Sequence, residues 1–169
     1  ISLGGSGGGI AIFGEGRIEM DGGYVVNNTA DTAGGGIAVH DSSSMYLTGG
    51  NIKNNQAHMG GGISLNAAKA FNPNSTKEEE RYGIYLNGGN VLENIATPDI
   101  SRGSVAYGGG ICISAQSTAK INNGLIKDNI VSTDGTTASG YAVNQEGGGV
   151  AVCEGSEVTF AGGTIEGNQ

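Results

Sequence analysis

The sequence predicts an all-β fold, a right-handed parallel β-helix (a solenoid) of about five coils with three short strands each and three loop insertions. Two observations lead to this prediction: two short motifs recur five times along the chain, and apolar residues alternate with polar or small ones between them. The 34 glycines among 169 residues do not follow a collagen-like period of three, so we expect them to shape turns.

The two motifs define the repeats. The first is Gly-Gly-Gly followed by Ile or Val, and it starts at Gly7, Gly34, Gly60, Gly108 and Gly147. The second ends in Ile or Val, two further residues and Asn, and it starts at Gly22, Gly49, Gly88, Asn123 and Gly162. Such self-similarity at a fixed period is typical of stacked repeats, so we expect equivalent strands to lie beside one another.

Alternation of apolar residues assigns the inward faces of the strands. In the first strands, the side chains expected to face inward are those of Ile10, Ile12, Ile37, Val39, Ile63, Leu65, Ile111, Ile113, Val150 and Val152. The second strands do so with Ile18, Met20, Met45, Leu47, Ile84, Leu86, Ala119, Ile121, Val158 and Phe160. The third strands contribute Val25, Ile52, Val91, Ile126 and Ile165.

One asparagine recurs at the same place in every repeat: Asn28, Asn55, Asn94, Asn129 and Asn168. An amide at that position can bond to its neighbours in the repeats above and below. We therefore expect a structural asparagine ladder at one corner, with no role in ligand chemistry.

Length and composition limit the organisation and the partners. Residues 1–169 fit a single domain, and since neither end shows an atypical capping repeat we expect a segment of a longer solenoid, with adjacent coils of the same parent chain as neighbours. The net charge of −8 without a basic cluster argues against nucleic acid. No run of about 18 apolar residues occurs, so no membrane insertion is expected.

The Gly-Gly-x-Ile start and the Ile-x-x-Asn end resemble the repeats of chlamydial polymorphic outer membrane proteins and related bacterial surface adhesins. They are more distantly similar to the pectate-lyase-like superfamily of right-handed β-helices. The resemblance covers nearly the whole chain apart from the insertions. It implies an extracellular segment, at the cell surface or secreted, with adhesion as the commonest role.

Three insertions, residues 67–82, 95–107 and 130–146, are expected to flank the outer face of the first strands and to form a groove. The expected floor consists of Ala11, Ala38, Ser64, Cys112 and Ala151, followed by Phe13, His40, Asn66, Ser114 and Cys153. Among these, His40, Ser64, Asn66 and Ser114 are candidate binding residues. The alternative is that small residues merely suit a face covered by folded-back loops.

Tyr46 and Tyr85 fall in the outward column of the second strands, with Glu19, Lys120 and Thr159. We expect the two rings to stack about 5 Å apart in adjacent repeats. The pair is a candidate sugar platform, and cross-strand aromatic packing explains it equally well.

No catalytic residue, metal site or cofactor is predicted. The outward columns of the first and second strands contain no stacked pair of acids, and we interpret Glu93 and Asp128, near Lys53 and Lys127, as a solvated corner. The run 77–81 is interpreted as a solvated loop face. Cys112 and Cys153 share a face two residues out of register, about 8 Å apart, which predicts two free thiols.

The sequence thus favours a non-enzymatic adhesin or stalk segment that presents loops to a glycan or to a host or matrix protein. The alternative is a carbohydrate-active module that binds polysaccharide, or cleaves it as a lyase or glycoside hydrolase. A third interpretation is a spacer without partners of its own.

Overall fold

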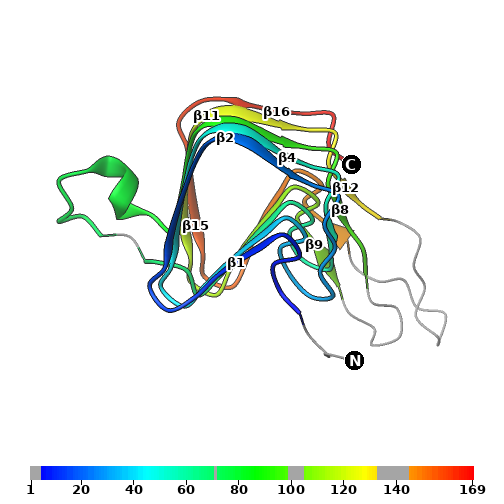
Figure 1. Ribbon diagram of the computed structural model, residues 1–169, viewed down its shortest axis with the longest axis horizontal. Helices are drawn as coiled ribbons and strands as arrows, with labels where there is room; N and C mark the ends of the chain where they lie inside the picture. The colour runs from blue at the N-terminus through cyan, green and yellow to red at the C-terminus, as the bar shows by residue number, and fades with distance from the viewer. Residues whose placement is uncertain (1–4, 71, 99–104, 133–144) are drawn as a thin grey trace.

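The structure is a computed structural model that describes residues 5–70, 72–98, 105–132 and 145–169. It is all-β, and all of its described sheets are parallel. The chain runs through the sheets in the same order in every repeat, so equivalent strands lie side by side (Figure 1). The described part of the chain contains no helix that could span a membrane.

Four sheets make up the described part of the chain. The first sheet contains β1 (Ile10–Ile12), β3 (Ile37–His40), β6 (Ile63–Asn66), β10 (Ile111–Ser114) and β14 (Val150–Val152). The second contains β2 (Arg17–Val26), β4 (Ser44–Lys53), β7 (Ile84–Leu92), β11 (Thr118–Lys127), β15 (Glu157–Phe160) and β16 (Thr164–Glu166). The third contains β5 (Gln56–Ala57), β8 (Ile95–Ala96) and β12 (Ile130–Val131), and the fourth β9 (Ala106–Tyr107) and β13 (Gln145–Glu146). A single 3₁₀ turn, η1 (Glu78–Arg81), lies in the described part of the first insertion.

The predicted register between repeats is confirmed. Tyr46 pairs with Tyr85, Tyr85 with Lys120, and Asn51 with Asn90. The predicted second and third strands differ from expectation, because in four repeats they are one continuous strand that bends at the second motif, as at Gly49 and Gly50. The register shifts of the second sheet fall at this bend, which is why the strand can turn there without ending.

The core fills the space between the first and second sheets. The predicted inward residues of the three middle repeats are all buried there: Ile37, Val39, Met45, Leu47, Ile52, Ile63, Leu65, Ile84, Leu86, Val91, Ile111, Ile113, Ala119, Ile121 and Ile126. The last repeat is different, since Val152, Val158, Phe160 and Ile165 are exposed at the open end of the stack.

The asparagine ladder is confirmed. Asn94 Nδ2 donates to Asn129 Oδ1 at 2.9 Å and to the Ile52 carbonyl at 2.9 Å, while its Oδ1 accepts from Nδ2 and the backbone N–H of Asn55, both at 3.0 Å. Each amide of the three middle repeats is fully buried and bonds in this way, so the ladder satisfies its own polar atoms.

In the second repeat, each glycine of the first motif stands where a side chain would be strained or would collide with the backbone. Gly34 adopts φ +63°, and a Cβ on Gly35 would lie 2.4 Å from the Gln56 carbonyl oxygen. A Cβ on Gly36 would lie 2.7 Å from the Gly62 oxygen and 3.0 Å from the ladder amide of Asn55. The triplet therefore lets the turn pack against the third sheet and the ladder at distances that no side chain permits.

Candidate functional site

The first insertion lies over the second sheet, and this corrects the predicted groove. The insertion begins directly after β6. Its turn η1 lies beside the outer face of β4, β7 and β11, on the left of Figure 1. The other two insertions begin and end in the third and fourth sheets, and their residues 99–104 and 133–144 lie outside the described residues. The three insertions therefore do not flank one face of the first sheet as predicted.

The first column of the predicted groove floor is also wrong, because four of its five residues are buried. Ser64 is 0% exposed and Ala38, Cys112 and Ala151 are buried too. The backbone of the preceding glycine turn covers this column: a Cβ on Gly60 would lie 2.9 Å from the Ser64 nitrogen. Small outward residues are needed here because larger side chains would collide with that turn, in agreement with the alternative that small residues suit a covered face. Ser64 is therefore not accessible to a ligand.

The remaining floor residues lie at the ends of the first-sheet strands. Ser114 is buried and donates to the Leu65 carbonyl at 2.9 Å, so it too is inaccessible. His40 and Asn66 are half-buried and pair in register, and the His40 ring stacks on Phe13 with centroids 5.6 Å apart. Their proposed binding role stays a prediction.

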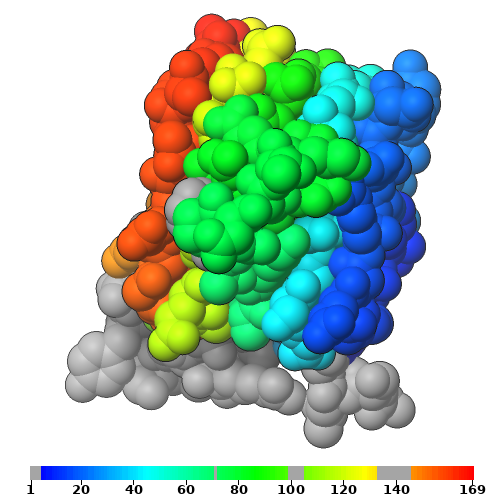
Figure 2. Space-filling view, turned by 90° about the vertical axis from the view of Figure 1, so that its left-hand side faces the viewer, coloured from blue at the N-terminus to red at the C-terminus, as the bar shows by residue number. Residues whose placement is uncertain are grey.

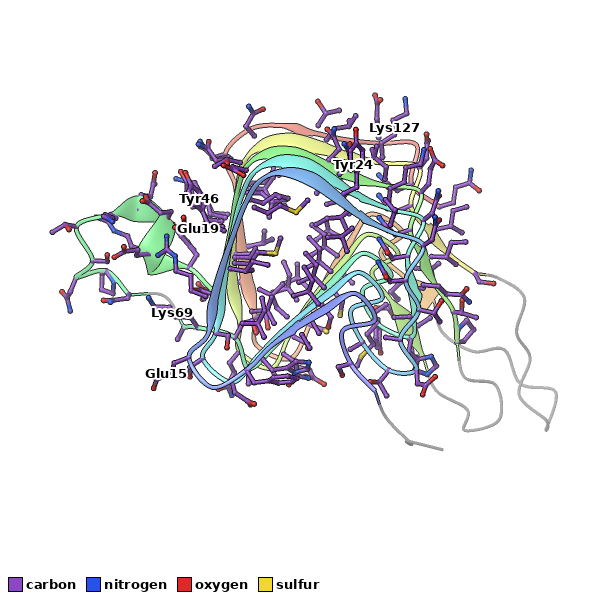
Figure 3. The ribbon with its side chains drawn as sticks, viewed as in Figure 1. Glu15, Glu19, Tyr24, Tyr46, Lys69 and Lys127 are labelled. Atoms are coloured by element: carbon purple, nitrogen blue, oxygen red, sulfur yellow. The ribbon has the colours of Figure 1, made fainter. Side chains whose placement is uncertain are left out.

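The tyrosine pair forms as predicted, but the insertion covers one of its members. The ring centroids of Tyr46 and Tyr85 are 5.5 Å apart at an interplanar angle of 53°. Tyr82, at the end of the insertion, places its ring 6.2 Å from that of Tyr85, which is only 5% exposed. Figure 3 shows Tyr46 and Glu19 pointing outward from the second sheet toward the insertion.

Glu78 attaches the insertion to the sheet. Its carboxylate accepts a hydrogen bond from the Tyr85 hydroxyl at 3.1 Å and forms an ion pair with Lys120, whose Nζ lies 5.9 Å from the Tyr85 ring centroid. The Lys120 ammonium and the Tyr85 hydroxyl lower the pKa of Glu78. Burial and the hydrogen bond to Glu78 raise the pKa of Tyr85 to about 12.

Glu80 makes a second attachment. It pairs with Lys77 at 3.3 Å, with Arg17 of β2 at 3.5 Å, and accepts from the Ser75 hydroxyl at 3.1 Å. These donors lower the pKa of Glu80, with Lys77 the largest contributor. The side chains of Lys77 and Glu78 are 64% and 47% exposed, as expected of a solvated loop face. Two glutamates of the run nevertheless hold the insertion on the sheet.

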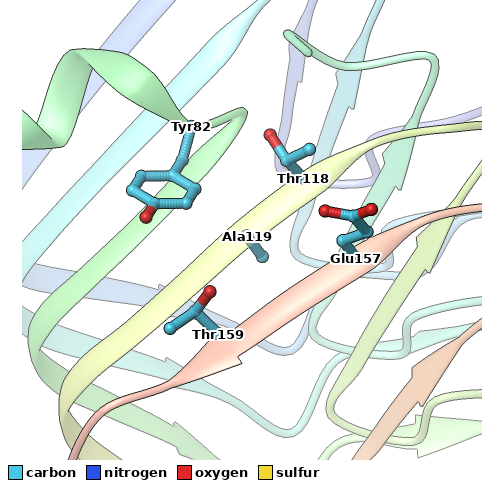
Figure 4. A pocket seen from close by; sticks show the side chains of 5 residues that line it. All are labelled: Tyr82, Thr118, Ala119, Glu157 and Thr159. Atoms are coloured by element: carbon cyan, nitrogen blue, oxygen red, sulfur yellow. The ribbon is translucent and has the colours of Figure 1, made fainter. Parts of the chain in front are cut away.

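The docked insertion forms a ridge with a hollow on each side, and Figure 2 shows it in green between the first repeats and the last. One hollow, of about 190 Å³, is lined by Tyr82, Thr118, Ala119, Glu157 and Thr159 (Figure 4). The other, of about 400 Å³, is lined by Glu15, Arg17, Ser42, Ser44, Lys69 and Glu80.

The hollow beside Tyr82 has the clearest combination of an aromatic ring and polar groups. Its floor is the outer face of β11 and β15, where Thr118 pairs with Glu157, and Tyr82 forms its wall. The sequence predicted the outward position of Thr159, but it did not indicate Tyr82, Thr118 or Glu157 as site residues. Alternation alone puts Glu157 on the same face as Thr159, whereas Tyr82 reaches the site only through the path of the insertion.

The remaining predicted groups lie apart from both hollows. Glu93 pairs with Lys53 at 2.9 Å and is half exposed, as expected of a solvated corner. Cys112 and Cys153 are both free thiols, as predicted, and burial raises the pKa of each. Within the described ranges, no three His, Cys, Asp or Glu side chains come together in a way that would hold a metal ion.

Comparisons with protein-family models, with curated proteins and with solved structures found no significant match for this chain. Functional inference therefore depends on the geometry of the insertion and its hollows.

Proposed function

We propose that this chain is a segment of a right-handed parallel β-helix in a cell-surface or secreted protein, and that it is a non-enzymatic binding segment of the adhesin type. In-register parallel pairing of equivalent strands through all five repeats supports the solenoid. The resemblance of the repeats to those of surface adhesins supports the extracellular location.

The observation that carries the binding function is the docked insertion. Residues 67–82 interrupt a regular repeat, yet they are fixed to the second sheet by Glu78 and Glu80. A loop held on a rigid scaffold presents side chains to a partner with little loss of entropy on binding. Two hollows follow from that placement, on either side of the ridge.

Glu78 and Glu80 are poor candidates for the proton donor of a glycoside hydrolase. A glycoside hydrolase needs a carboxylic acid with a raised pKa as proton donor. Glu78 and Glu80 have lowered pKa values because lysine and hydroxyl donors stabilise their charged forms. Both carboxylates thus serve to hold the insertion in place.

A carbohydrate-binding module is the second candidate function, and one observation favours it. Tyr82 stands beside a carboxylate and two threonines in a hollow on the outer face of a sheet. Binding of polysaccharide needs only such a surface, whereas cleavage would need a proton donor in addition.

A binding screen tests the proposed function. The wild-type chain and a variant that replaces residues 67–83 by the short turn 41–44 are compared on a glycan array and on a panel of matrix proteins. Thermal unfolding of both shows that the repeats remain folded. Binding by the wild type that disappears in the trimmed variant supports the proposal. Equal binding by both forms would overturn the role of the insertion and place the binding site elsewhere on the repeats. No binding by the wild type would overturn the proposed function and favour a spacer.

A further inference from the structure

We propose that the hollow lined by Tyr82, Thr118, Glu157 and Thr159 is a subsite for one pyranose ring that carries no acidic group. This inference rests on the proposed binding function and names the class of ligand. It concerns the second sheet, and none of the four residues belongs to the floor of the groove predicted from the sequence.

The shape of the hollow fits a flat ring. Its floor is two neighbouring parallel strands, β11 and β15, whose outward residues Thr118 and Glu157 lie side by side, as do Lys120 and Thr159. Tyr82 rises beside this floor from the end of the insertion (Figure 4). Its ring is steadied by Tyr85, which packs in turn against Tyr46.

The volume limits the ligand to one ring. Pockets that enclose drug-sized molecules begin at about 300 Å³, and this hollow measures about 190 Å³. It lies on an open sheet face, so a longer chain of sugars can continue past it along the surface.

The polar groups select against an acidic ligand. Glu157 forms no ion pair within the described residues, and its carboxylate can only accept hydrogen bonds. Lys120, the nearest cation in the same column, is already paired with Glu78. A net charge of −8 adds to the repulsion of uronic acids and sialic acids.

A sugar ring matches this combination of groups. The C–H face of a pyranose is apolar and suits the ring of Tyr82, while its hydroxyls donate to a carboxylate. The Thr118 hydroxyl already donates to the Lys69 carbonyl at 3.0 Å. This hydrogen bond helps to hold the insertion, which carries Tyr82, against the floor of the hollow. Thr159 is exposed and available to a further hydroxyl of the sugar.

Saturation-transfer NMR and calorimetric titration on the intact chain test the proposal. The probes are cellotetraose as a neutral glycan, chitosan tetramer as an amino-sugar glycan, and tetragalacturonate as an acidic one. We expect binding of at least one of the first two, with weaker or no binding of tetragalacturonate. Tighter binding of tetragalacturonate than of both others, or binding of none of the three, would overturn the proposal.

Matched substitutions locate the site. Tyr82→Ala should weaken binding about tenfold through loss of the aromatic face, whereas Tyr82→Phe should retain it. Tyr24→Ala removes a tyrosine that is 77% exposed elsewhere on the second sheet and should leave binding unchanged. Glu157→Gln should weaken binding several-fold, while Glu93→Gln, at the solvated corner apart from both hollows, should not.

The outcomes separate this proposal from the proposed function. Binding that depends on the insertion but is unaffected by Tyr82→Ala and Glu157→Gln would overturn the sugar subsite and leave the binding segment intact. Binding of a lysine-rich peptide at this hollow, with none of the glycans bound, would likewise overturn it in favour of a protein partner.

Discussion

The Tyr85 hydroxyl donates a hydrogen bond to Glu78 Oε2 at 3.1 Å, and this contact joins the insertion to the column of aligned residues on the second sheet. Tyr85 belongs to a regular repeat and Glu78 to the segment that interrupts it. The contact therefore links the regular and irregular parts of the sequence, and the candidate site depends on it.

Tyrosine titration probes this contact directly. Tyr85 should ionise near pH 12, later than an exposed tyrosine, because burial and the neighbouring Glu78 carboxylate disfavour the phenolate. Glu78→Gln removes the negative charge and should lower the pKa of Tyr85 by part of the shift, because burial, the largest cause, remains. Absorbance at alkaline pH measures the step, and Tyr85→Phe identifies it by its loss. An unchanged titration in Glu78→Gln would contradict the contact.

Acid should release the insertion from the sheet. The pKa values of Glu78 and Glu80 are lowered from 4.5, so their contribution to docking is complete above that pH and is lost as the pH falls through the lowered values. Hydrogen exchange of residues 75–83 should accelerate between pH 4.5 and the acid range after correction for intrinsic rates. The asparagine ladder carries no charge and serves as the internal control.

The asparagine ladder should be a major source of stability. Asn94→Ala leaves the Ile52 carbonyl and the amide of Asn55 without their partner, which costs about 2 to 4 kcal/mol of the free energy of unfolding. Asn54→Gly is the matched control, because Asn54 is exposed at φ +55° and glycine accepts that conformation. Urea denaturation compares the two, and equal stability would refute the structural role of the ladder.

The glycine triplet should tolerate no side chain at its second position. Gly35→Ala places a Cβ 2.4 Å from the Gln56 and Gly61 carbonyl oxygens and should cost about 3 kcal/mol or more. Gly22→Ala meets no atom within 4 Å and should change the stability little. Thermal unfolding of the two variants tests the packing, and similar losses in both would contradict it.

The register of the stack could be predicted from the sequence because two periods fix it together. Alternation sets the inward face, and the repeat sets the partner, so Tyr46 beside Tyr85 follows from spacing alone. The asparagine ladder could be predicted for the same reason: five identical residues recur at one position.

The predictions failed where the path of the backbone between strands decided the outcome. Ser64 alternates like an outward residue, yet the glycine turn of its own repeat folds over it, and spacing does not reveal that turn. The insertion could have lain over either sheet, since its place is decided by the contacts of Glu78 and Glu80 with distant strands. Tyr82 reaches its hollow only through that path.

The most direct test of the docked insertion is the nuclear Overhauser effect between Glu78 and the side chains that hold it. In the intact chain at neutral pH, we predict cross-peaks from Glu78 to Lys120 and to Tyr85. Random-coil shifts for residues 75–82, with no cross-peak to β7 or β11, would contradict the account, because both hollows depend on the insertion being docked.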